Sequence, residues 1–112
     1  MVGKLNTYNI TRNDSYVEAM KFIDGETGNP IDLTTYDEIK MDLRYSPQSG
    51  GRLLSSGFTF TIHGDDNNIL LIENEETDWS SGKYHRDIKF IKGNLIETLL
   101  EGDVQVRENI TI

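Results

Sequence analysis

The last third of the chain, residues 82–112, constrains the fold most. Two runs in which apolar and polar residues alternate lie on either side of Gly93-Asn94, a dipeptide typical of tight hairpin turns. Gly102 then separates the second run from a third, Val104–Ile112. We therefore expect three consecutive antiparallel strands here, and these strands set the pairing for everything that precedes them.

Further strands are expected upstream. In Asp37–Tyr45 apolar residues alternate strictly with Lys40, Asp42 and Arg44, the pattern of a strand with one face in water. A second pair of runs, Phe58–Ile62 and Ile69–Ile72, flanks the polar turn Asp65–Asn68 and predicts a hairpin. The apolar run of Ile69–Ile72 is continuous, which is typical of the middle of a sheet.

The N-terminal segments are less regular. Leu5–Thr11 has a weak strand pattern, and the apolar residues of Tyr16–Ile23 fit either a strand or a helix. Turn residues directly before and after the second segment, Asp14-Ser15 and Asp24-Gly25, favour a strand. Asp24–Pro30 is expected to be an exposed loop, since it holds two glycines and a proline.

One segment, Glu73–Gly82, is expected to form a helical turn that seats Trp79 against the core and ends at Gly82. The remaining pattern of about seven or eight short strands predicts an all-β fold, an antiparallel β-sandwich. With 112 residues the chain is expected to form one domain, residues 1–112. Met41, Phe60 and Phe90 are expected to fill the space between its two layers.

Composition limits the partners. The chain has 19 acidic and 11 basic residues and a formal net charge of -8, so a nucleic-acid backbone would be repelled. It has no cysteine, which excludes disulfides, thiolate metal sites and cysteine nucleophiles. No run of apolar residues is long enough to span a membrane, and the first residues, with a single Lys and no apolar stretch, lead us to expect no secretion signal. We expect neither nucleic acid nor membrane as a partner.

No group of residues predicts catalysis, a metal or a cofactor. His63 and His85 have no second imidazole at ligand spacing, and Asp65–Asn68 lacks the spacing of a calcium loop. The carboxylates of Glu73–Asp78 are more typical of a solvated loop than of a glycosidase pair. The serines lie outside the motifs that activate a nucleophile. We therefore expect a protein that is not an enzyme and has no catalytic, metal or cofactor residues.

The order of several weak signals resembles a widespread phage family, the N-terminal domain of the upper baseplate protein of siphophages and related small virion proteins of tailed phages. The residues that carry this resemblance are turn and strand residues that extend over nearly the whole chain. They are Asn13-Asp14-Ser15, Asp24, Gly28–Thr34, Glu76-Thr77, Gly82–Ile88, Thr98–Gly102, Val104 and Val106.

The resemblance implies an immunoglobulin-like sandwich that is not enzymatic and attaches to other proteins of the tail, baseplate or neck. It further implies a ring-forming homo-oligomer, located in the virion and assembled in the cytoplasm of the bacterial host. The sequence ends at Ile112 without an extension that would carry a receptor-binding protein. The resemblance implies that such a domain holds receptor-binding or fibre proteins. That role and the role of a stand-alone adaptor, collar or surface component therefore both stay open. Candidate docking edges are the strands Leu5–Thr11 and Val104–Ile112.

An alternative of another class is a carbohydrate-binding, receptor-binding module. β-Sandwiches bind glycans through exposed aromatic rings, and Tyr36, Tyr45, Trp79 and Tyr84 are the candidates for such a platform. The competing interpretation places Trp79 and Tyr84 in the core, where they would stabilise the fold and bind nothing.

Overall fold

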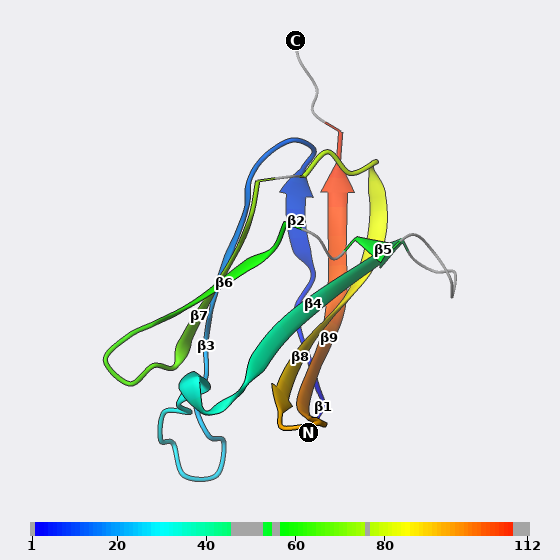
Figure 1. Ribbon diagram of the computed structural model, residues 1–112. Coiled ribbons are helices and arrows are strands. Elements are labelled where there is room, and N and C mark those ends of the chain that lie inside the picture. Colours follow the sequence, from blue (N-terminus) through cyan, green and yellow to red (C-terminus); the bar gives the residue numbers. More distant parts are fainter. Residues whose placement is uncertain (1, 46–52, 55–56, 76, 109–112) are drawn as a thin grey trace.

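The computed structural model describes residues 2–45, 53–54, 57–75 and 77–108, and these residues form an all-β sandwich of two sheets (Figure 1). Nine strands and one short 3-10 helix are present in this part of the chain. They are β1 (Val2–Lys4), β2 (Tyr8–Thr11), β3 (Tyr16–Lys21), η1 (Leu33–Thr35), β4 (Glu38–Tyr45), β5 (Leu53–Leu54), β6 (Thr59–His63), β7 (Ile69–Asn74), β8 (Gly82–Lys92) and β9 (Leu95–Arg107).

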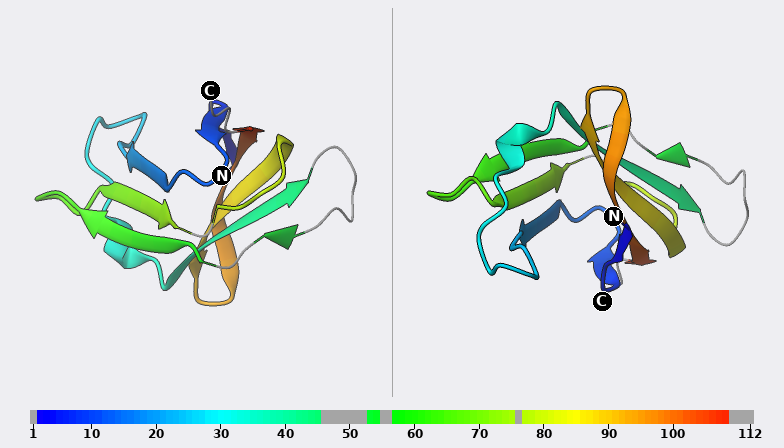
Figure 2. Two further views of the ribbon diagram at one scale, coloured as in Figure 1. Left: turned by 90° about the horizontal axis from the view of Figure 1, so that it is seen from above. Right: turned by 90° about the horizontal axis from the view of Figure 1, so that it is seen from below.

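The strand order is that of an immunoglobulin-like domain, as expected. A large sheet has the order β1-β9-β8-β4-β5, with β2 also paired to β9, and a small sheet has the order β3-β7-β6. Figure 2 shows these two layers from both ends of the sandwich. All pairs are antiparallel except those of β1 and β2, which both run parallel to β9. The large sheet is therefore mixed rather than purely antiparallel.

The core lies between the two sheets. Of the residues expected there, Met41 and Phe90 are almost fully buried, whereas Phe60 is half-buried and packs against the core from the small sheet. Alternation explains this arrangement, because every second residue of a strand points to the same face. The buried apolar residues are Ile10, Tyr16, Leu33, Met41, Leu43, Leu70, Ile72, Trp79, Tyr84, Ile88, Phe90, Val104 and Val106.

The expectation of two strands separated at Gly102 is wrong, because β9 is continuous from Leu95 to Arg107. Gly102 is needed for a close approach and not for a turn. A Cβ added at Gly102 would lie 2.9 Å from the Cβ of Leu5 and 3.0 Å from its carbonyl oxygen. Leu5 follows β1 alongside β9, where its N–H donates to the carbonyl oxygen of Glu101 over 2.6 Å, and only glycine leaves room for this close approach.

The expected helical turn in Glu73–Gly82 is also wrong. β7 extends to Asn74, and residues 77–81 are not helical. Residues 77–81 are held in place by the Thr77 hydroxyl, which donates a hydrogen bond to the carbonyl oxygen of Asp14. Trp79 is buried against the core, as expected. Gly82 has a φ of 143°, and a Cβ there would lie 2.9 Å from the hydroxyl oxygen of Tyr45 and 3.0 Å from its ring, so this glycine begins β8 instead of ending a helix.

Helical structure instead occurs at η1, where none was expected. Asp32 caps it, because its side chain accepts a hydrogen bond of 2.9 Å from the backbone N–H of Thr34. The same bond, with one from the Thr34 hydroxyl, lowers the pKa of Asp32. No helix in the described residues has the length and hydropathy to cross a membrane.

Candidate docking surfaces

The histidines lie apart from one another and from the acidic turns. His63 is exposed on β6, and His85 is half-buried on β8 with its Nδ1 3.7 Å from Oδ1 of Asp103. Among residues 2–45, 53–54, 57–75 and 77–108, no three histidine, cysteine or acidic side chains are placed to hold a metal ion.

The turn Asp65–Asn68 joins β6 to β7, as the sequence predicts. Asn67 takes a φ of 54° and donates its backbone N–H to the carbonyl oxygen of Gly64 over 3.1 Å. The Asn68 side chain is buried and donates to the carbonyl oxygen of Phe22 over 3.1 Å. Asn67 thus forms the turn, and Asn68 ties the hairpin to the residue that follows β3. These structural roles explain why asparagines occupy both positions.

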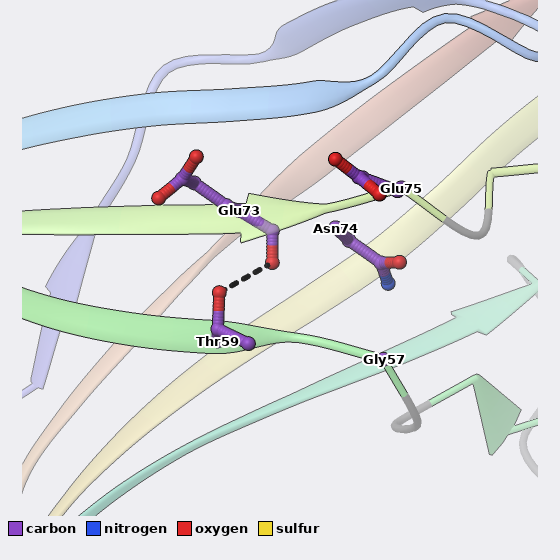
Figure 3. Close-up of a pocket in the computed structure, with 5 residues that line it drawn as sticks. All are labelled: Gly57, Thr59, Glu73, Asn74 and Glu75. Carbon is purple, nitrogen blue, oxygen red and sulfur yellow. Dashed lines mark hydrogen bonds between the residues drawn. The ribbon is translucent and has the colours of Figure 1, made fainter.

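The acidic segment after β7 borders an open hollow, lined by Gly57, Thr59, Glu73, Asn74 and Glu75 (Figure 3). The carboxylates of Glu73 and Glu75 point to one side of the strand and the Asn74 side chain to the other. The Thr59 hydroxyl donates to the backbone carbonyl of Glu73 over 3.4 Å and not to a carboxylate.

The other acids of this segment do not complete a site in the described residues. Asp78 is well exposed and forms an ion pair with Nε of Arg12 at 2.8 Å, which helps to raise the pKa of Arg12. Glu76 lies outside the described residues. Glu75 and Asp78 are exposed beyond the strand, as expected of a solvated loop, whereas Glu73 lies on β7 and is half-buried.

The four aromatic rings do not form a common platform. Trp79 and Tyr84 are 7% and 3% exposed, so the interpretation that placed them in the core is confirmed. The Tyr84 hydroxyl donates to the carbonyl oxygen of Ser80 over 2.8 Å, the tyrosine corner typical of immunoglobulin-like sandwiches. Only Tyr45 is exposed, at 43%, and its ring packs edge-on against Tyr84. Tyr36 is half-buried against Phe90.

A buried cation joins the two sheets. Arg86 of β8 is the one charged residue that breaks the alternation of its strand, and it points inward with its side chain 1% exposed. Its guanidinium donates to both carboxylate oxygens of Glu18 on β3, to the hydroxyl of Tyr16 over 2.6 Å and to the carbonyl oxygen of Asn6 over 3.1 Å. The ring of Tyr8 lies 5.9 Å from the guanidinium carbon.

These contacts keep the group charged. Burial lowers the pKa of Arg86, but hydrogen bonds and charge interactions with Glu18 and Tyr16 outweigh it, so that the pKa is raised. Burial disfavours the charged form of the Tyr16 hydroxyl as well. For this acidic group it raises the pKa, so the hydroxyl stays neutral. Because Arg86 is closed off from solvent, this cluster stabilises the sandwich and is not a binding site.

The outer face of the large sheet is charged. In register across β4, β8 and β9 lie Asp42, Asp87 and Glu101. Lys89 lies in a neighbouring row of the same face and forms ion pairs with two of these acids. Its Nζ is 3.2 Å from the carboxylate of Asp42 and 4.0 Å from that of Asp87. Burial, with the nearby charge of Asp42, raises the pKa of Asp87 in spite of Lys89. Ion pairs such as Lys83 with Asp103, 3.3 Å apart, continue this pattern toward the end of the sheet.

The outer face of the small sheet is different, and we name its nine outward residues the small-sheet face. They lie in three rows across β3, β7 and β6, namely Val17-Glu73-Thr59, Ala19-Leu71-Thr61 and Lys21-Ile69-His63. The middle strand contributes two half-buried apolar residues to this face, because β7 is apolar on both sides. Figure 1 shows no further layer of chain over this face.

Charge divides the small-sheet face along its strands. The row that contains Lys21 and His63 is basic or neutral, whereas Glu73 makes the opposite row acidic. Among the described residues, neither Lys21 nor Glu73 belongs to an ion pair within the chain. Val17 is 50% exposed, as is Ile23 just beyond the end of β3.

Of the two expected docking edges, one is present. β2 pairs only with β9 and forms an edge. The expectation that the chain from Val104 onward is an edge is wrong as far as Arg107, because β9 lies between β8 and β2. Residues 109–112 of that segment lie outside the described residues. An edge that the sequence did not reveal is β3, which pairs only with β7. The Tyr8 hydroxyl donates to the Val17 carbonyl on this edge over 2.8 Å.

Comparison with known proteins supports the fold alone. No protein-family model matches the chain, and no curated protein sequence does. A solved structure of InlP from Listeria monocytogenes is similar over 95% of this chain, with 14% sequence identity and a TM-score of 0.53, and the chain spans 27% of that protein's length. The cysteine protease inhibitor EhICP2 from Entamoeba histolytica matches over 95% of both chains, with 16% identity and a TM-score of 0.45.

Proposed function

We propose that the chain is a non-enzymatic structural protein of a tailed-phage virion. It would act as an adaptor or attachment domain of the tail, baseplate or neck, through contacts with other virion proteins and with further copies of itself in a ring. The ordered motifs that resemble the upper baseplate family support the virion assignment. The geometry supports the mode of action, which is docking through a surface.

The observation that carries this proposal is the small-sheet face. An antiparallel sheet with one face in water normally alternates apolar and polar residues, but β7 places Ile69 and Leu71 outward as well as Leu70 and Ile72 inward. Together with the half-exposed Val17, these half-buried residues form an apolar surface that no other segment among the described residues covers fully. Such surfaces are typical of protein interaction sites.

Charge limits the kind of neighbour. At a net charge of -8, repulsion disfavours a phosphate backbone or an anionic membrane surface, so the proposed partners are proteins. Protein interfaces typically have an apolar centre and a polar rim. The small-sheet face fits this description, with Leu71 at its centre and Lys21, His63 and Glu73 at its ends.

The test is detection of the chain in purified particles. Antibodies against the chain, coupled to gold and viewed by electron microscopy on virions from the producing strain, should label one place on the tail, baseplate or neck. Virions from which the gene has been deleted serve as the control. Absence of the chain from washed particles would contradict the proposal.

A further inference from the structure

The small-sheet face has opposite charges at its two ends, and this arrangement limits the kind of partner surface that can bind to it. Its two end rows are complementary, since Lys21 and His63 flank Ile69 at one end and Glu73 lies between Val17 and Thr59 at the other. Its middle row, Ala19-Leu71-Thr61, is uncharged. Within its nine residues the face is basic at one end, acidic at the other and uncharged between them, and such a pattern is complementary to itself when turned end for end.

From this we infer that the small-sheet face binds the same face of a second copy of the chain. The two sheets pack face to face around a two-fold axis that runs along the middle row, perpendicular to the strands. β7 then lies over β7 of the second copy with the opposite strand direction, and Leu71 meets its counterpart at the axis. Face-to-face sheets pack about 10 Å apart and about 30° from parallel, with their side chains interdigitated.

The ends of the strands provide the specificity. In this arrangement Glu73 of one copy faces Ile69 of the other, so its carboxylate lies between the side chains of the other copy's Lys21 and His63. The same contact occurs twice because of the two-fold axis. Glu73 and Lys21 form no ion pair within their own chain among the described residues, and the second copy supplies one for each.

The small-sheet face is open to such an approach. The ribbon views show that the large sheet packs against the inner side of the small sheet, opposite the small-sheet face (Figures 1 and 2). Three strands of five or six residues form a small interface, and small interfaces give weak complexes. We therefore expect a dimer that forms and dissociates with protein concentration.

This inference goes beyond the proposed function and does not depend on it. It identifies one neighbour, a second copy, whether or not the chain belongs to a virion. A two-fold contact closes after two copies, so a ring would need another contact in addition. Loss of the dimer with the chain still present in particles would overturn only the inference, and a dimer of a chain absent from particles would overturn only the proposed function.

Sedimentation equilibrium on the intact chain over a range of concentrations tests the contact. The variants Lys21→Glu and Glu73→Lys each place like charges together twice, and each should raise the Kd of the dimer about tenfold or more. The double variant K21E/E73K exchanges the two charges and should restore most of the affinity. The controls are Lys40→Glu and Glu38→Lys, which make the same two changes at an exposed ion pair on the large sheet, and their Kd should equal that of the wild type.

A second measurement avoids charged substitutions. The chain has no cysteine, so Ala19→Cys places a single thiol in the middle row, close to the two-fold axis. A short bis-maleimide should join two copies of this variant and should not join Lys40→Cys, whose thiol lies on the large sheet. Three results would each overturn the inference. The wild type could stay monomeric at all concentrations, the double variant could have a dimer Kd as high as either single variant, or the Ala19→Cys and Lys40→Cys variants could cross-link equally.

Discussion

The outer faces of the two sheets show two different ways to end a sandwich. On the large sheet, Lys89 forms ion pairs with both Asp42 and Asp87. On the small sheet, Ile69 and Leu71 place apolar side chains where the large sheet places charges. The strands that bear these residues, β4 and β8 on the large sheet and β7 on the small one, all pair antiparallel with their neighbours, so the difference lies in the residues. The difference supports the proposal that the small sheet docks against a partner, while the charged face of the large sheet suits contact with water.

The largest effect should come from the charge that lies inside the sandwich. Glu18→Ala leaves the buried guanidinium of Arg86 without its carboxylate, and breaking a buried pair in this way typically costs about 3–5 kcal/mol. Asp42→Ala breaks an ion pair on the outer face with Lys89 and should cost less than about 1 kcal/mol. Urea unfolding of both variants measures the difference. Equal losses would mean that Arg86 does not depend on Glu18.

The next effect compares two neighbouring leucines of β7 on opposite faces. Leu70 is fully buried, so Leu70→Ala should lower the free energy of unfolding by about 2–5 kcal/mol through the cavity it leaves. Leu71 points outward, and Leu71→Ala should cost the monomer less than about 1 kcal/mol. In sedimentation experiments the order should reverse, because only Leu71→Ala should weaken self-association. A folded L70A monomer that associates less well than L71A would contradict the assignment of faces.

The smallest effect concerns pH and the outer face of the large sheet. Burial raises the pKa of Asp87 in the folded state, so this group lowers stability as the pH rises from its ordinary value through the raised one. Asp87→Asn removes that loss and should raise the free energy of unfolding at pH 7, by less than about 1 kcal/mol. The gain should disappear in acid, where the carboxyl is protonated in both the folded and the unfolded state.

The control for this effect is Asp103→Asn, which removes the ion pair with Lys83 and should slightly destabilise the protein at pH 7. Urea unfolding of both variants at neutral and acidic pH separates the two cases. A D87N variant that is less stable than the wild type at pH 7 would show that Lys89 outweighs the burial of Asp87.

Much of the sandwich could be predicted from the sequence where neighbouring residues determine it. The strict alternation around Met41 gave β4 almost to the residue, and the turn at Gly93 placed β8 beside β9. The polar turn at Asn67 placed β6 beside β7. These features are local, because a strand's period and a turn's backbone angles depend on the residues that form them.

The errors occurred where distant segments decide the structure. Gly102 was interpreted as a break between strands, but a side chain there would collide with Leu5, which is far away in the sequence and lies beside it in the fold. The parallel pairing of β1 and β2 with β9 is likewise non-local and leaves no pattern in either segment. By contrast, the cap of η1 had a local signal that was missed, since Asp32 two residues before Thr34 is a common capping arrangement.

The small-sheet face, which we propose as a docking surface, was missed for a related reason. The sequence showed that Ile69–Ile72 is apolar on both sides, and this was correctly taken to indicate a middle strand. It could not show that the sheet containing it has only one covered face. The outward exposure of Val17 and the rows across β3, β7 and β6 follow only from the register of the three strands. A site composed of surface rows can be recognised only after the strands are paired.

Methyl NMR spectra of the intact chain over a dilution series test the central claim most directly. The account predicts that the signals of Val17, Ile69 and Leu71 shift together as the concentration rises, while those of Leu99 and Ile91 on the large sheet stay unchanged. Spectra in which the large-sheet methyls shift instead, or in which no methyl responds to concentration, would contradict it.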